Sequence, residues 1–181
     1  MSEPILIMGI CGTYDLDSAN GRMLELLLDE CRKLGAETVV WDHGAKPLPL
    51  VGAEGSWDDE NVKEFQELAT SSDAFVLSSP EYHGTMSGVM KNSLDWLYSK
   101  HTKGKVFGLM STLGGQPSNN TLNHMRIAAR WIYGWVAPEQ VAVPHIKEAF
   151  NEDGSLVSDT IMERVTSLAS SIVTNTTKLR R

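Results

Sequence analysis

Short runs of apolar residues alternate along the chain with longer stretches in which apolar positions recur every three or four residues. The runs lack the polar alternation of a half-exposed strand, and they predict five strands covered on both faces, at residues 5–10, 37–41, 74–78, 105–111 and 140–143. The longer stretches predict helices at residues 18–35, 59–71, 87–97, from the glycines at 114–115 to about residue 134, and 158–179.

Strands that alternate with helices predict an α/β fold with a parallel sheet, because parallel strands need crossover connections and right-handed crossovers place helices on both faces. The expected architecture has three layers and five parallel strands in the order 2-1-3-4-5. At 181 residues the chain fits one domain, residues 1–181. Residues 42–59, rich in proline and glycine, predict an unusually long loop that is either functional or part of an interface.

Charge and cysteine content narrow the function classes. The formal net charge is -7, and lysine and arginine are scattered, which argues against a nucleic-acid partner. Residues 1–10 lack a basic segment and a long apolar run, so we expect no signal peptide, no membrane span and a cytoplasmic location. The two cysteines predict neither a zinc site nor a disulfide framework; Cys31 has core spacing, whereas Cys11 could be an exposed loop thiol.

In an open parallel sheet a ligand binds at the carboxyl ends of the strands, where the strand order reverses. The loop after the first strand, residues 12–20, is rich in hydroxyl groups and leads into a helix, whose free N–H groups attract phosphate. Thr13, Ser18 and Asn20 can add hydrogen bonds, although capping of the helix explains such residues equally well. The dinucleotide fingerprint GxGxxG and the P-loop GK[ST] are absent from this loop.

The loops after the third and fourth strands can flank a planar ligand from two sides. Pro80 to Gly84 are expected to end the third strand, and the N–H groups of residues 81–84 and the ring of Tyr82 can border the ligand, although such a segment alone is more often a plain turn. In residues 111–116 two glycines allow close approach of the backbone. His83 can donate to a ligand or cap a carbonyl, and Glu81 is a general base or, more simply, a group that binds a helix terminus.

The remaining candidates have structural interpretations. Trp131 and Trp135, read as one helix face, fit the core or a subunit interface better than an active site. Lys91, Asn92 and Asp95 are expected mainly to fix their helix to its neighbours. Neither a Ser-His-Asp arrangement nor a metal-binding cluster competes with the ligand site, so no catalytic side chain and no metal is predicted.

Two motifs carry a resemblance to a known family. Residues 80–83 read PEYH and residues 88–96 read GVMKNSLDW, and further matches lie at 111–115, in "MRIAARWIYGWVAP" and in "IKEAFNEDGSL". The chain thereby resembles the NADPH-dependent FMN reductase family, a flavodoxin-like group that includes azoreductases, chromate reductases and quinone reductases.

The resemblance implies FMN as cofactor and NADPH or NADH as co-substrate, with two electrons passed by ping-pong transfer to quinones, azo compounds, metal oxyanions or free flavin. It places the FMN phosphate at Thr13, Ser18 and Asn20, and the isoalloxazine ring along two segments, Pro80, Glu81, Tyr82 and His83 and then Ser111, Gly114, Gly115 and Gln116. It also implies a homodimer or homotetramer, with Trp96, Trp131 and Trp135 as candidates for subunit contacts.

One departure from the family pattern bears on the cofactor. The family's first loop usually carries arginine where this chain has Asp15, and a carboxylate facing a phosphate would repel it; Arg22, a turn away, could compensate. Two other functions stay open, and the second of them follows from the Asp15 departure. One is a single-electron carrier of flavodoxin type, and the other is a scaffold module that has lost tight FMN binding.

Overall fold

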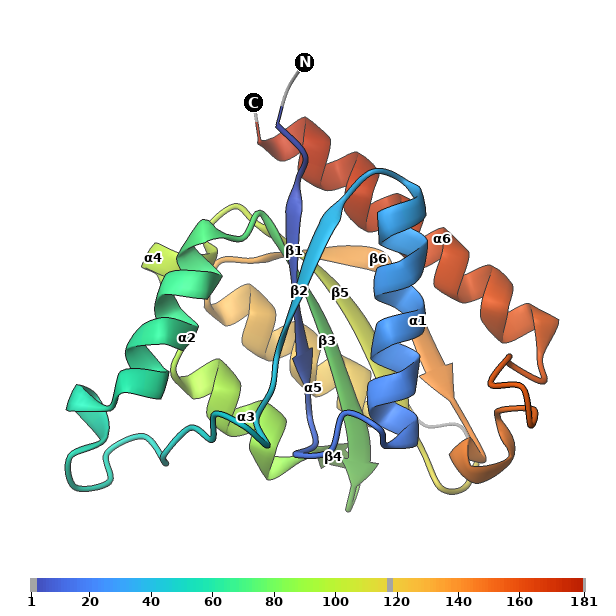
Figure 1. Ribbon diagram of the computed structural model, residues 1–181, viewed down its shortest axis with the longest axis horizontal. Coiled ribbons are helices and arrows are strands. Elements are labelled where there is room, and N and C mark those ends of the chain that lie inside the picture. Colours follow the sequence, from blue (N-terminus) through green and yellow to red (C-terminus); the bar gives the residue numbers. More distant parts are fainter. Residues whose placement is uncertain (1–2, 117–118, 181) are drawn as a thin grey trace.

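Five parallel strands form the centre of the protein (Figure 1). The computed structural model describes residues 3–116 and 119–180. The strands lie in the order β2-β1-β3-β5-β6, which confirms the predicted order 2-1-3-4-5. Their bounds are β1 Leu6–Cys11, β2 Glu37–Trp41, β3 Ala74–Tyr82, β5 Val106–Thr112 and β6 Trp135–Val143.

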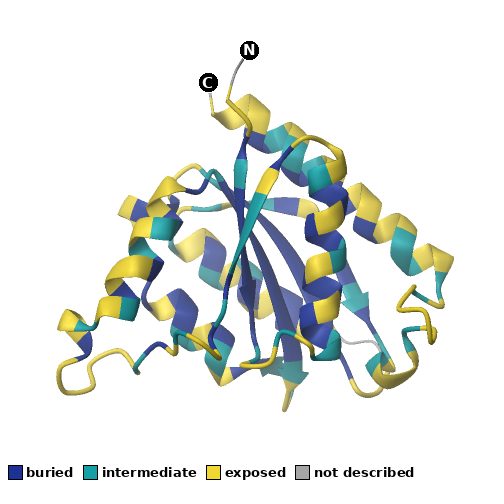
Figure 2. Cartoon of the chain, in the orientation of Figure 1, coloured by how far each residue is buried: buried dark blue, intermediate teal, exposed yellow. Residues whose placement is uncertain are grey.

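Helices cover both faces of the sheet (Figure 2). One face packs against α1 (Ala19–Lys33) and α6 (Asp159–Leu179). The other packs against α2 (Glu60–Ser71), α3 (Gly88–Asp95) and α5 (Asn120–Trp131). The short helices α4 (Ser99–Thr102), η1 (Ser56–Asp58) and η2 (Ile146–Glu148) lie in the connections. The three layers thus follow from strands that are apolar on both sides.

The two apolar clusters give the sheet a rigid interior. Phe75 of β3 and Phe107 of β5 stack with ring centroids 4.6 Å apart, and both are fully buried. On the opposite face a Cβ at Gly108 would lie 2.3 Å from Ile172 of α6, so only glycine lets this helix approach so closely. Close packing of this kind fixes the strand ends, and with them the loops that follow.

The expectation that Pro80 to Gly84 end the third strand is wrong. β3 continues to Tyr82, and Pro80 lies in register with Thr112 of β5. In a parallel strand residues two apart turn their amides to the same side, and Ser78 is the last residue of β3 paired with β1. The ring nitrogen of Pro80 therefore faces the side where β1 has already ended, and the missing N–H leaves no partner unsatisfied.

Other boundaries also differ from the prediction. β6 begins at Trp135 rather than at residue 140, so Trp131 and Trp135 are not on one helix. A Cβ at Gly134 would lie 2.5 Å from the Phe107 ring, and the chain turns there into the strand. Cys11 is fully buried in β1 rather than an exposed loop thiol. Trp96 is fully buried as well, which excludes it from the surface available for subunit contacts.

Within the described ranges, every helix is too short or too polar to cross a membrane.

Candidate functional site

Three loops with unusual composition meet at the carboxyl ends of β1, β3 and β5, at the lower edge of the sheet in Figure 1. The N–H of Gly12 donates to the carbonyl of Ser78 at 2.7 Å, and the hydroxyl of Ser87 donates to the carbonyl of Gly12 at 2.6 Å. A Cβ at Gly12 would lie 2.9 Å from the Ser87 hydroxyl oxygen. The loop after β1 is therefore locked against the segment that follows β3.

The loop after β1 presents hydroxyl and amide groups at the start of α1. Ser18 caps this helix, because its hydroxyl oxygen accepts from the N–H of Gly21 at 3.2 Å, and it lies 3.1 Å from the hydroxyl of Thr13. Among the described residues, the loop N–H groups of Thr13, Tyr14 and Leu16 have no protein acceptor. Free N–H groups beside a helix N-terminus form a suitable environment for a phosphate.

Asp15 is exposed, and its carboxylate is engaged by its own loop. One carboxylate oxygen accepts from the N–H of Asp17 at 2.9 Å, which is an Asx turn. The guanidinium of Arg22 lies 3.9 Å from the centroid of the Phe150 ring, so this cation is held against the loop after β6. Asp15 thus has a structural role in the loop, and Arg22 has a partner of its own.

Asn20, expected near the phosphate, is only 4 % exposed. Its amide nitrogen donates to the carbonyl of Ser78 at 2.9 Å and to the sulfur of Cys11 at 3.3 Å. Its amide oxygen accepts from the hydroxyls of Ser78 and Thr112, both at 3.1 Å. The side chain therefore ties the ends of β1, β3 and β5 together beneath the loops.

The segment after Pro80 is a two-residue hairpin, not an irregular loop. Tyr82 pairs with Thr85 in the antiparallel β4 (Thr85–Met86), and the two residues between them both have positive φ, 51° at His83 and 78° at Gly84. Positive φ at both central positions is the signature of a type I′ turn. Tyr82 is 55 % exposed at the hairpin tip, so its ring is free to border a ligand.

Glu81 binds a helix terminus, as its structural interpretation predicted. Its carboxylate accepts from the hydroxyl of Thr121 at 3.0 Å and from the Thr121 N–H at 3.4 Å, in the first turn of α5. A carboxylate there neutralises free N–H groups and the positive end of the helix dipole. The hairpin is fixed a second time where Thr85 lies 2.7 Å from the Nδ1 atom of His124.

The loop after β5 is open and lies beside a residue that sequence patterns did not single out. Of the residues that the structure describes, none lies within 4 Å of a Cβ placed at Gly114 or Gly115, and Gln116 is exposed. Ser111 is fully buried, and its hydroxyl oxygen has no hydrogen-bond partner among the described residues. The N–H of His145, after β6, donates to the carbonyl of Gly115 at 3.2 Å. No local motif marks His145; its signal is this contact.

The motif on α3 supports the site without entering it. Lys91 and Asp95 form an ion pair at 2.6 Å. The amide of Asn92 donates to the carbonyls of Leu48 and Pro49 at 3.2 Å and 3.0 Å. The indole N–H of Trp96 donates to the same Pro49 carbonyl at 2.8 Å. The contacts of Asn92 confirm its expected role, and with Trp96 they anchor the long loop after β2. The Lys91–Asp95 pair lies within α3, so it does not fix the helix to a neighbour.

His43 joins that loop to two other elements. Its Nε2 atom lies 3.0 Å from the hydroxyl of Ser93 in α3, and its ring meets Tyr14 edge-on with centroids 6.2 Å apart. The imidazole is 2 % exposed, and burial lowers its pKa to about 4 even though Asp42 favours the charged form. His43 is therefore neutral at neutral pH and acts as a buried link.

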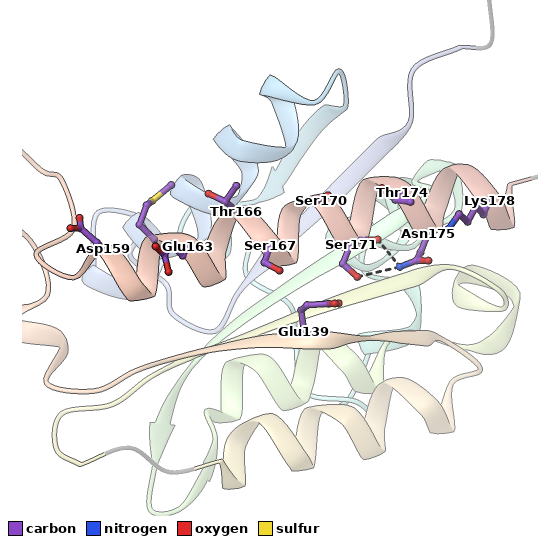
Figure 3. A pocket seen from close by; sticks show the side chains of 11 residues that line it. Glu139, Asp159, Glu163, Thr166, Ser167, Ser170, Ser171, Thr174, Asn175 and Lys178 are labelled. Atoms are coloured by element: carbon purple, nitrogen blue, oxygen red, sulfur yellow. Dashed lines mark hydrogen bonds between the residues drawn. The ribbon is translucent and has the colours of Figure 1, made fainter.

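A separate surface groove of about 780 Å³ runs along α6 and is lined by hydroxyl, amide and carboxylate groups, among them Ser167, Ser171, Asn175 and Glu139 (Figure 3). No aromatic side chain belongs to its lining, so it offers a planar ring no stacking surface. The described residues also hold no group of three or more His, Cys, Asp or Glu side chains that could bind a metal ion. The strand edge remains the better candidate site.

Comparison with protein-family models and with known proteins points to one family. Residues 5–148 match the family model described as NADPH-dependent FMN reductase. The FMN-dependent NADPH-azoreductase of Staphylococcus aureus is 33% identical over 151 residues, which are 81% of this chain and 80% of that protein.

Two solved structures share the fold. A flavoenzyme from Paracoccus denitrificans, an NAD(P)H:(acceptor) oxidoreductase, superposes with a TM-score of 0.78 at 22% identity over 96% of this chain and 98% of its own. An archaeal flavodoxin superposes with a TM-score of 0.64 at 13% identity over 97% and 99%. The match over residues 5–148, together with the azoreductase relative, shows that the chain belongs to the NADPH-dependent FMN reductase family of enzymes, which use FMN and NAD(P)H.

Proposed function

We propose that this chain binds FMN at the carboxyl ends of β1, β3 and β5 and uses NAD(P)H to reduce small-molecule acceptors by ping-pong transfer. Quinones, azo compounds, metal oxyanions and free flavin are the acceptor classes. The observation that carries the proposal is the meeting of three loops that offer different chemical groups at one edge of the sheet. The loop after β1 offers N–H and hydroxyl groups for a phosphate, while the other two offer backbone and an exposed ring for a planar system.

The residues present fit the cofactor. Thr13, Ser18 and the N-terminus of α1 would hold the phosphate, and Asn20 would keep their loop in place rather than touch the ligand. The ring system would lie along two segments, Pro80, Glu81, Tyr82 and His83 and then Ser111, Gly114, Gly115 and Gln116. The buried hydroxyl of Ser111 has no partner within the described ranges, so it is available to a ligand that reaches it.

Bound FMN supplies the hydride chemistry, and the chain's residues bind and orient. Glu81 holds the hairpin against α5, and the type I′ turn sets the position of Tyr82. The exposed faces of Tyr82 and of residues 114–116 leave room for the nicotinamide and then for the acceptor. No side chain is required as an acid or base, since the acceptor exchanges protons with solvent.

A second copy of the chain fits the surface beside this site. An apolar groove of about 560 Å³ lies between α3 and α5, where Ile127 is 60 % and Trp131 is 74 % exposed. Exposed apolar residues that flank such a groove are typical of protein interfaces. We therefore propose that the chain forms a homodimer or homotetramer through this groove. We also propose that residues 1–181 form one domain and that the protein is cytoplasmic.

An anaerobic absorption titration of the FMN-supplemented protein with NADPH and then NADH tests the function. We expect the oxidised flavin bands to bleach at a catalytic rate and to return when a quinone is added. Bound FMN whose bands persist would favour a single-electron carrier. Failure of FMN to bind would favour a scaffold module and direct attention to Asp15.

A further inference from the structure

His145 adopts a backbone conformation that glycine normally supplies. It lies between β6 and η2 with a φ of 47° and a ψ of 46°, in the left-handed region. For a residue with a Cβ this conformation is unfavourable, and strained residues of this kind cluster at functional sites. The imidazole is exposed and has no hydrogen-bond partner in the part of the chain that the structure describes. The strain therefore calls for an explanation outside the fold itself.

Two backbone hydrogen bonds join this turn to the loop after β5. The N–H of His145 donates to the carbonyl of Gly115 at 3.2 Å, and the N–H of Ile146 donates to the carbonyl of Leu113 at 2.9 Å. The backbone of His145 is thus held beside residues 113–116, the segment that the proposed function assigns to the ring system of FMN.

Few side chains at this rim can carry a positive charge. Residues 113–119 and 144–158 contain two side chains able to carry positive charge, His145 and Lys147. No backbone hydrogen bond joins Lys147 to the loop after β5 within the described ranges. The loop after β1, residues 12–20, contains Asp15 and Asp17 and no lysine or arginine. Arg22 of α1 also lies against the loop after β6, where its guanidinium contacts the Phe150 ring. Of His145, Lys147 and Arg22, His145 is the one whose backbone is hydrogen-bonded to the loop after β5 in the described part of the chain.

We infer that His145 donates a hydrogen bond to the pyrimidine edge of FMN and binds the reduced cofactor more tightly than the oxidised one. This inference rests on the proposed function. In the overall reaction NAD(P)H gives up a hydride, which is two electrons and one proton, and leaves as NAD(P)⁺. The acceptor takes up the two electrons and two protons, the second from solvent. Between the two half-reactions the electrons would be held by FMN, with negative charge at the pyrimidine edge of its ring. A hydrogen-bond donor at that edge would lower the free energy of the reduced cofactor.

The test compares His145→Gly with Lys147→Gln in FMN-loaded protein. The midpoint potential is measured against dyes of known potential, and the affinity for oxidised FMN by fluorescence quenching. For His145→Gly we expect a tenfold loss of preference for reduced FMN, which is a fall of about 30 mV for a two-electron couple. Its affinity for oxidised FMN should change by less than about twofold, and the FMN-free variant should melt at a higher temperature because glycine adopts positive φ without strain. Lys147→Gln should change neither the potential nor the affinity.

Several results would overturn the inference. An unchanged potential in His145→Gly with FMN bound removes the role of the imidazole while leaving the proposed function intact. An equal fall in Lys147→Gln means that the loop charge acts without a specific contact. If His145→Gly melts at a lower temperature and loses affinity for oxidised and reduced FMN equally, His145 has a structural role. If the wild-type protein binds no FMN, both the inference and the proposed function fail.

Discussion

The clearest prediction concerns Asn20. If its side chain binds the phosphate, its replacement should weaken FMN binding; if its role is structural, its replacement should lower the free energy of unfolding. Asn20→Ala removes three hydrogen bonds, two to Ser78 and one to Thr112, together with a weaker contact to the sulfur of Cys11. At about 1 kcal/mol for each ordinary hydrogen bond, the free energy of unfolding should fall by about 3 kcal/mol. The small void left at a position 4 % exposed adds to this loss.

The assay is urea unfolding of the FMN-free protein at pH 7, followed by FMN titration of the folded variants. Asn61→Ala is the matched control, because among the described residues that half-buried side chain makes a single hydrogen bond, to the carbonyl of Pro47 at 3.0 Å. It should cost less than about 1 kcal/mol. Asn20→Asp, which keeps the shape but turns an acceptor toward the Ser78 carbonyl, should destabilise as strongly as Asn20→Ala.

The reasoning is refuted if Asn20→Ala unfolds within about 1 kcal/mol of the wild type and yet loses FMN affinity more than about tenfold. Asn20 would then contact the phosphate directly, and the hydrogen bonds beneath the loops would carry little stability.

Four further predictions follow from the same site. Ser18→Ala should lower the free energy of unfolding by about 1 kcal/mol and should also weaken FMN binding. Ser158→Ala removes the equivalent cap of α6 and should lower the free energy of unfolding alone. Unfolding curves and FMN titrations of both variants test this. Asp15→Arg should tighten FMN retention if Asp15 faces the phosphate; unchanged or weaker retention would leave Asp15 only its structural role, as acceptor from the N–H of Asp17. Tyr82→Ala should weaken flavin or acceptor binding and leave the unfolding midpoint in place, since the ring is 55 % exposed; global unfolding would contradict this. Burial lowers the pKa of His43 to about 4, below its unfolded value near 6.5. Its contribution to stability should therefore be full above pH 6.5 and fall by about 2 kcal/mol by pH 5, as the unfolded state takes up the proton. Burial also lowers the pKa of His101 to about 4, so unfolding of His43→Asn should show a shallower pH dependence rather than a flat one; an unchanged slope would contradict the role of His43.

The alternation of apolar runs and amphipathic stretches was sufficient to predict the sheet order, because parallel strands leave few topologies open. It failed where a local rule depends on neighbours in space. Pro80 looks like a strand terminator until one knows that β1 has already ended beside it. Trp135 matches the helical spacing of Trp131, yet Gly134 turns the chain into β6.

The site shows the same limit. The loops were identifiable from composition, because strand ends collect at one edge of a parallel sheet. The partners of Asn20 lie 58 and 92 residues away, so no local pattern could reveal that its amide is already engaged. His145 stood outside every motif, and only the backbone conformation and the hydrogen bond to Gly115 distinguish it.

The anchoring of the long loop by α3 changes the role assigned to the motif at residues 88–96. Asn92 and Trp96 bind the backbone carbonyls of Leu48 and Pro49, and neither contact depends on the side chains beyond that point. The motif thus holds the loop in place, as a clamp, and takes no part in the chemistry. Downstream of the clamp, residues 50–55 are exposed and end at η1. Because the anchoring contacts use backbone carbonyls alone, we expect the side chains of residues 50–55 to be replaceable without loss of the anchor.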